Sequence, residues 1–223
     1  MIVSFSKQFI FIHNPKCAGT SLREIFNDYN PAGLLFNSNQ ELDIYRVENA
    51  ELLRSGDEQQ RALSLKTHDT IMDAQEVLSD STFTQFFKFG FVRNPWDREV
   101  SHYHFIRSWQ EHRFHLQVMA LNTFDDYVNW RSDNPELYDM SQHKYFLDKE
   151  GNLLMDYIGR YESLSDCIRL ITQKLGISVI EVPHLNQSIH EDYRSHFTDD
   201  SADKIARLHE TDIKLFNYCF ENN

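Results

Sequence analysis

The sequence predicts an α/β fold in which a central, mainly parallel sheet is flanked by helices. Short apolar runs of strand length alternate with stretches of helical periodicity, which is the pattern of a sheet covered on both faces. Two of these runs, Phe9–His13 and Phe87–Arg93, each lead through a sharp turn into a helix. The 223 residues suffice for one core, and no linker or internal repeat marks a boundary. We therefore expect a single domain over residues 1–223.

Three apolar runs are predicted as core strands, namely Phe9–His13, Ala62–Thr67 and Phe87–Arg93. A turn is predicted at Lys149–Asn152, because these polar residues separate Phe146 from Leu153. Residues 37–61 and 110–145 are polar or mixed, and their pattern does not resolve them.

Three helices are predicted from apolar spacing and end signals. The first places Leu22, Ile25, Phe26 and Tyr29 on one face and stops at Asn30–Gly33. The second carries an apolar stripe from Leu164 to Leu175, begins with Ser163 and Asp166 as a capping-box-like pair, and ends at Gly176. Residues Asp199–Tyr218 form the third, closing helix.

Composition and charge exclude several classes of protein. A net charge of −12 and a pI near 5.3 argue against binding nucleic acid through bulk electrostatics. The apolar run at the N-terminus is too short to span a membrane and lacks a cleavage signal, so we expect a cytoplasmic protein. Three widely spaced cysteines indicate no disulfide framework. We expect no metal site either, since the spacing of the clustered histidines provides no tetrahedral set; they are His102, His104, His112 and His115.

The turn between the first strand and the first helix has the composition of an anion site. A helix N-terminus offers unpaired backbone N–H groups and the positive end of the helix dipole, and Gly19 lets that backbone approach a ligand closely. Thr20 and Ser21 add hydroxyl donors, while Lys16 adds a charge. The alternative is a capped turn with a solvated lysine. In nucleoside triphosphate loops the lysine comes late and magnesium is bound, whereas here Lys16 precedes the single glycine, so ATP with a metal fits poorly.

The second strand-to-helix turn, in FKFGFVRNPWDREVSHYHF, contains two polar residues that folding does not explain. Asn94 caps the helix, Pro95 suits its first position, and Asp97 suits support of the cap. Arg93 at the end of an apolar strand and Ser101 in the helix suit a clamp for a second phosphate. The alternative for Arg93 is a structural salt bridge with Asp97 or Asp69.

Together, IHNPKCAGTSL and FGFVRNPWDREVSHYHF, about 75 residues apart, resemble the two nucleotide-binding segments of sulfotransferases that use 3′-phosphoadenosine 5′-phosphosulfate (PAPS). The resemblance is to the carbohydrate-type branch, and it continues more weakly through SQHKYFLDKEGNLLMDYIGRYESL and VPHLNQSIHEDYRSHFTDD, where it is to bacterial members. It implies a P-loop-like three-layer fold, PAPS as co-substrate, and no metal.

The resemblance also implies roles for individual residues. The first segment would hold the 5′-phosphosulfate and the second the 3′-phosphate, through Arg93 and Ser101. Ser188 and Arg194 would add to a lid. At Cys17 relatives often carry threonine, which leaves the contact at that position open. The expected contacts at the 5′ end are Lys16, Cys17, Ala18, Gly19, Thr20 and Ser21.

Sulfuryl transfer requires a group that stabilises charge on the leaving oxygen and a base that takes the acceptor proton. Lys16 suits the first task. His68, just beyond the run Ala62–Thr67, suits the second, and some relatives have a histidine at the matching place while others use glutamate. The alternative for His68 is a loop histidine hydrogen-bonded to Asp69.

Two other functions are considered. Cys17 and Arg23 have the spacing of a thiolate phosphatase loop, although Glu24 follows where those loops have Ser or Thr. A non-catalytic nucleotide-binding protein acting through interactions is the other. For the sulfotransferase, the resemblance implies a saccharide hydroxyl as acceptor, and Tyr103, Trp109 and Trp130 with the clustered histidines could contact it. The acceptor's identity and the oligomeric state have no signal in the sequence.

Overall fold

The computed structural model describes residues 1–29, 44–45, 48–49, 51, 53, 56–136, 140–178 and 192–221. The chain divides into two compact units, one of Met1–Val92 with Lys144–Asn186 and the other of Arg93–His143 with Gln187–Asn223. Each unit has an apolar core of its own. A single domain over residues 1–223 stays a prediction.

The first unit is built on a four-stranded sheet with the order β1-β2-β3-β4. β1 (Ile2–Ser4) pairs antiparallel with β2 (Phe9–Ile12), whereas β3 (Phe87–Val92) runs parallel to both β2 and β4 (Tyr157–Arg160). The register places Ile12 of β2 opposite Gly90 of β3, so the carboxyl ends of these two strands are neighbours. The predicted α/β class with a mainly parallel sheet is confirmed.

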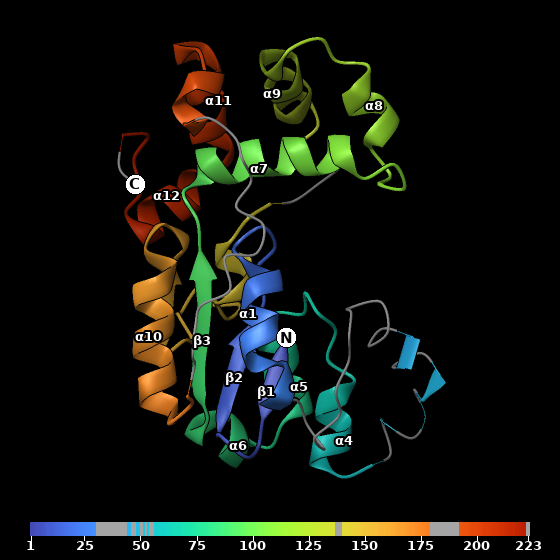
Figure 1. The fold of residues 1–223 in the computed structure, drawn as a ribbon, viewed down its shortest axis with the longest axis vertical. Helices are drawn as coiled ribbons and strands as arrows, with labels where there is room; N and C mark the ends of the chain where they lie inside the picture. The colour runs from blue at the N-terminus through green and yellow to red at the C-terminus, as the bar shows by residue number, and fades with distance from the viewer. Residues whose placement is uncertain are drawn as a thin grey trace. The chain divides into compact units, whose positions relative to one another are not determined.

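Two helices pack on one face of this sheet through a cluster of phenylalanine rings. Figure 1 shows α1 (Gly19–Phe26) and α10 (Leu164–Leu175) beside the strands. They contribute Leu22, Phe26 and Ile168 to a core that includes Phe11 and Phe89. The rings of Phe11 and Phe89 are 5.3 Å apart, and that of Phe26 lies 5.2 Å from Phe89. The predicted apolar faces of both helices are thereby confirmed. α10 ends at Gly176 as predicted, with the left-handed φ of 60° that favours glycine.

The predicted strand Ala62–Thr67 is wrong. Ala62 and Leu63 close the short helix α4 (Glu58–Leu63), and a turn follows. A capping box between Asp57 and Gln60 starts this helix. The apolar run does mark buried residues, since Ala62 and Leu63 are buried, but their secondary structure is set by the polar residues before them. The other short helices around the sheet are η1 (Asn27–Tyr29), α5 (Ile71–Val77), α6 (Asp80–Gln85) and η4 (Tyr161–Ser163).

Two smaller predictions about the first unit have opposite outcomes. The turn at Lys149–Asn152 is confirmed, because Asp148 N donates to Asn152 O at 2.9 Å. The capping box of α10 is wrong, because Ser163 makes no side-chain cap hydrogen bond; its hydroxyl lies 3.5 Å from Cys167 Sγ instead. The predicted stop at Asn30–Gly33 lies outside the described residues.

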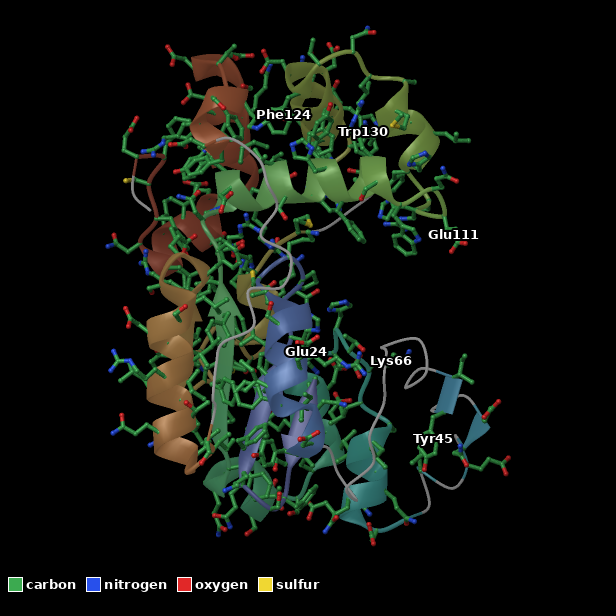
Figure 2. The ribbon with its side chains drawn as sticks, in the orientation of Figure 1. Glu24, Tyr45, Lys66, Glu111, Phe124 and Trp130 are labelled. Atoms are coloured by element: carbon green, nitrogen blue, oxygen red, sulfur yellow. The ribbon has the colours of Figure 1, made fainter. Side chains whose placement is uncertain are left out.

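The second unit is helical and is organised around α7 (Pro95–Ser108). α8 (His115–Met119), α9 (Phe124–Asp133) and α11 (Asp199–Leu208) lie on one side of α7, with α9 and α11 at a steep angle to it (Figure 1). Figure 2 shows Phe124 and Trp130 on α9, and their rings lie 5.2 Å from Tyr103 and 5.3 Å from Phe114. The predicted closing helix is interrupted at His209, after which α12 (Glu210–Phe216) begins. The remaining turns are η3 (His143–Tyr145) and η5 (Tyr193–His196).

No helix among the described residues is long and apolar enough to cross a membrane.

Candidate functional site

The loop between β2 and α1 has a strained backbone. Lys16 and Ala18 adopt φ angles of 65° and 61°, in the left-handed region that residues with a side chain rarely occupy. Each such residue costs on the order of 1 kcal/mol, so the surrounding contacts must hold the loop in this shape. One of these contacts is the buried Asn14, whose Nδ2 donates to the carbonyl of Phe91 in β3 at 3.0 Å.

The N-terminus of α1 has no side-chain cap, a feature that it shares with α8, α10 and α12. Its cap residue, Ala18, makes no side-chain cap hydrogen bond, whereas Thr70, Thr123 and Thr198 accept from backbone N–H groups at the starts of α5, α9 and α11. At α1 no cap side chain competes with an anion for the backbone donors. Lys16, in the loop before α1, is partly buried, and Ser21, in the first turn of α1, is buried. The side chain of Thr20 lies outside what the structure describes.

Gly19 is required by a close contact with His13. A Cβ on Gly19 would lie 1.4 Å from His13 Nε2, a distance that no side chain could occupy. The His13 ring is buried and stacks on Phe11, with centroids 6.1 Å apart. Burial, and then the nearby His68, hold the pKa of His13 well below 6.5, so its ring is neutral at physiological pH. Sequence reasoning missed His13; its signal is a histidine at the end of an apolar strand.

His68 is exposed and lies next to His13. Its Nδ1 is 3.2 Å from the His13 carbonyl oxygen, and the two rings are 4.6 Å apart. A carbonyl oxygen only accepts, so Nδ1 carries the proton and Nε2 keeps its lone pair, as a general base requires. The Asp69 carboxylate, which the alternative interpretation pairs with His68, accepts from the Lys66 backbone N–H at 2.7 Å. His68 follows a turn after α4, not a strand.

Cys17 is buried in the core of the first unit, with an exposed fraction of 1%, and its Sγ lies 3.6 Å from the Pro15 carbonyl oxygen. A reactive thiolate needs an accessible, electropositive setting. The position of Cys17 among phenylalanine and isoleucine side chains therefore opposes the thiolate phosphatase that its spacing from Arg23 suggested.

Arg93 directly follows β3 and is fixed at both its side chain and its backbone. Its Nε and Nη2 donate to the two carboxylate oxygens of Asp97 at 2.7 and 2.9 Å. Its N–H donates to Gln142 Oε1 at 3.0 Å, and its carbonyl accepts from Gln142 Nε2 at 2.8 Å. The salt bridge with Asp97, which the sequence left as an alternative, is thus present. Ser101 is buried on α7, as is Arg93 at the start of that helix.

The cap predicted for α7 is confirmed. Asn94 Oδ1 accepts from Trp96 N at 3.1 Å, and Pro95 occupies the first helical position. Asp97 is bound by Arg93 instead of supporting the cap. Gln142, which sequence reasoning missed, lies in a mixed stretch without periodicity and gave no signal.

The predicted residues therefore fall into two groups. The first group lies in the first unit, at the junction of β2 and α1, and His68 contacts the His13 carbonyl close to this junction. Its members are Lys16, Cys17, Ala18, Gly19, Thr20 and Ser21. The second group, Arg93 and Ser101, belongs to the second unit. Arg194 also belongs to the second unit and pairs with Asp192, with Nε 2.8 Å from Oδ1; Ser188 lies outside the described residues.

Several of the clustered histidines bind protein groups. His102 Nδ1 is 3.0 Å from the Tyr127 hydroxyl, and His115 Nδ1 is 2.9 Å from the Ile106 carbonyl oxygen. Within the described part of the chain, no three His, Cys, Asp or Glu side chains are grouped to hold a metal ion.

Comparison with known proteins shows the family to which the chain belongs. The chain matches the sulfotransferase family (Sulfotransfer_2) over residues 1–219. Its fold is similar to that of mouse sulfotransferase SULT7A1, solved in complex with PAP, with a TM-score of 0.50, 16% identity, and coverage of 98% of this chain and 91% of that one. An uncharacterized protein of Archaeoglobus fulgidus is 28% identical over 116 residues, which are 50% of this chain and 86% of that protein. Because the family match extends over nearly the whole length, this chain belongs to the sulfotransferase family of enzymes.

Proposed function

We propose that this enzyme transfers a sulfuryl group from PAPS to a hydroxyl of an acceptor, in the cytoplasm. The observation that carries the proposal is the family match over residues 1–219, and it is supported by a strand-to-helix loop whose helix has no side-chain cap. A sulfotransferase of similar fold was solved with PAP, the nucleotide that remains after PAPS gives up its sulfuryl group.

The loop after β2 would bind the 5′-phosphosulfate. Backbone donors at the start of α1 and the hydroxyls of Thr20 and Ser21 suit its oxygens, and the left-handed Lys16 and Ala18 shape the loop around them. Cys17 would contribute through its backbone, since its thiol is buried.

Arg93 and Ser101 would bind the 3′-phosphate. Asp97 holds the guanidinium from one side, which orients the planar group and lowers the entropy lost when an anion binds. A 3′-phosphate distinguishes PAPS from ordinary adenosine nucleotides, so this pair would determine donor specificity.

The chemical step would need one residue that stabilises the leaving group and one that removes the acceptor's proton. The bond between sulfur and the bridging phosphate oxygen breaks, and a bond forms between sulfur and the acceptor oxygen. Lys16 would stabilise the negative charge that grows on the bridging oxygen. His68 Nε2 would take the acceptor's hydroxyl proton, because the bond from Nδ1 to the His13 carbonyl oxygen fixes the required tautomer. Neither role uses a metal.

The acceptor would be a saccharide. Of the three aromatic residues considered for it, Trp109 is the one with a large exposed fraction, 45%, whereas Tyr103 is buried and Trp130 packs against the core of the second unit. Trp109 is therefore the aromatic side chain best suited to stack on a sugar ring.

Calorimetric titration tests the donor. We expect 3′,5′-adenosine bisphosphate to bind more tightly than 5′-AMP or ATP, and without magnesium, since each charge-assisted contact to the 3′-phosphate adds about 1.5 to 3 kcal/mol. Binding of the bisphosphate that is equal to or weaker than that of ATP would contradict the proposal.

A further inference from the structure

A chain of buried polar side chains runs through the second unit and ends at the backbone of Arg93. Its central pair is Glu99 and His209, with His209 Nε2 3.0 Å from Glu99 Oε1. Arg131 Nη2 lies 3.1 Å from the same oxygen, and the Tyr127 hydroxyl donates to Glu99 Oε2 at 2.7 Å. His209 Nδ1 in turn lies 3.8 Å from Asp212 Oδ2. All five side chains are buried.

Asp212 connects this buried group to the loop that carries Gln142. Its two carboxylate oxygens accept from the backbone N–H groups of Gln142 and His143, at 2.7 and 2.8 Å. His143 Nδ1 lies 2.6 Å from Asp212 Oδ1. Burial would raise the pKa of Asp212, but the hydrogen bond from His143, the nearby His209 ring and the two backbone hydrogen bonds hold this pKa far below its ordinary value. The ionised carboxylate of Asp212 thus fixes the backbone at Gln142 and His143.

Gln142 passes this fixation to Arg93. Its amide is fully buried and makes two hydrogen bonds to one residue, accepting from the Arg93 N–H at 3.0 Å and donating to the Arg93 carbonyl at 2.8 Å. The Gln142 side chain therefore pairs with Arg93 as a neighbouring strand would. Because Arg93 directly follows β3, it is held at its backbone by Gln142 and at its guanidinium by Asp97.

We propose that Gln142, anchored by Asp212, is a positioning residue that sets Arg93 for recognition of the 3′-phosphate. The inference rests on the proposed function, and deepens it by assigning donor specificity to residues that do not touch the nucleotide. Bidentate guanidinium contacts depend on orientation, so a shift of the Arg93 backbone weakens them even while Asp97 holds the side chain.

The test is the ratio of affinities for 3′,5′-adenosine bisphosphate and 5′-AMP, measured by calorimetry. Gln142→Met keeps the length of the side chain and removes both hydrogen bonds to Arg93. We expect it to weaken bisphosphate binding about tenfold, and 5′-AMP binding less than about twofold. Asp212→Asn retains the shape of the anchor with a weaker acceptor, and we expect it to lower the ratio by about threefold. This second variant carries the test if Gln142→Met does not fold.

Val128→Ala is the matched control. Val128 is fully buried in the core of the same unit, and its substitution lowers stability by leaving a cavity while removing no polar group of the chain. We expect the affinity ratio of this variant to equal that of the native enzyme. If Gln142→Met loses stability as Val128→Ala does but keeps the native ratio, or if both ligands weaken in parallel, the positioning role is refuted.

Arg93→Ala separates this inference from the proposed function. If the native enzyme prefers the bisphosphate and Arg93→Ala abolishes the preference while Gln142→Met keeps it, only the positioning role fails. A native enzyme that binds 5′-AMP as tightly as the bisphosphate refutes both.

Discussion

Two neighbouring histidines of the first unit are suited to different tasks. His13 is buried, neutral and wedged against Gly19, so it serves the shape of the loop. His68 is exposed, and its bond to the His13 carbonyl oxygen leaves Nε2 as the acceptor. His68 is therefore the proposed base, and its arrangement depends on the residue that shapes the loop between β2 and α1.

Replacing His68 with alanine tests this division. We expect kcat to fall by about 10² to 10⁴, the usual contribution of a general base, while affinity for 3′,5′-adenosine bisphosphate stays unchanged. Sulfate transfer from labelled PAPS and calorimetry measure the two quantities. Asp69→Asn is the control. Asp69 accepts from the Lys66 backbone, so we expect this substitution to leave kcat unchanged. A His68→Ala enzyme with native kcat would show that another group takes the proton.

Replacing Cys17 with serine tests the thiolate alternative. We expect kcat within about twofold of native and a modest loss of stability, because a hydroxyl replaces a thiol in an apolar core. Thermal unfolding and the transfer assay measure these effects. Loss of all activity with an unchanged unfolding temperature would instead indicate a chemical role for the thiol.

At the scale of elements, the strands predicted around β2 and β3 and the faces of α1 and α10 are confirmed, because apolar periodicity records burial directly. The run Ala62–Thr67 has the same composition and is not a strand, since Asp57 and Gln60 begin a helix before it. The strand β4 was missed because Tyr157–Arg160 ends in arginine and is only partly buried. Burial could be predicted from this sequence more reliably than hydrogen-bonding pattern.

The junction of β2 and α1 depends on one glycine. We expect Gly19→Ala to force the His13 ring away, since the new Cβ would lie 1.4 Å from His13 Nε2. The substitution would then disturb both the loop between β2 and α1 and the carbonyl that holds His68. Binding of 5′-AMP should weaken about tenfold or more, as for a displaced phosphate loop. Calorimetry measures the affinity and thermal unfolding the stability.

Gly159→Ala is the control for this element. Its Cβ would meet Phe91 Cε1 at 2.6 Å, within the sheet, so it should lower stability without a comparable loss of affinity. Equal losses of affinity in the two variants would mean that Gly19 acts only through general stability.

At the scale of the whole molecule, the contacts that order the second unit join residues far apart in sequence. Arg93 meets Gln142 and Gln142 meets Asp212, across 49 and 70 positions. The local sequence pattern indicated that an arginine at position 93 is unusual for the end of an apolar strand. It could not predict that Gln142 binds the Arg93 backbone, because a buried glutamine in a stretch without periodicity has no recognisable pattern. The candidate phosphate ligands were predictable by resemblance, whereas the residues that hold them were not.

The buried charges of this unit predict how its stability depends on pH. His209 faces Glu99 and Asp212; Arg131, Tyr127 and His102 face Glu99 as well, and His143 faces Asp212. Burial alone would lower the pKa of His209, but the nearby Asp212 carboxylate and the hydrogen bond and charge of Glu99 raise it above the ordinary value of 6.5. A raised folded-state pKa means that the protonated ring stabilises the fold fully below pH 6.5. This contribution is lost as pH rises through the folded-state pKa.

We therefore expect the difference in free energy of unfolding between the native enzyme and His209→Gln to shrink as pH rises from about 6 to about 9. Urea denaturation across this range measures it, and taking the difference cancels the titration of groups that both proteins share. His13 is the most prominent of these: its lowered pKa costs stability below pH 6.5, the opposite sign. A difference that stays constant with pH would show that His209 is neutral between the two carboxylates. The buried group would then carry a net negative charge, and the anchoring of Gln142 by an ionised Asp212 would need another source of compensation.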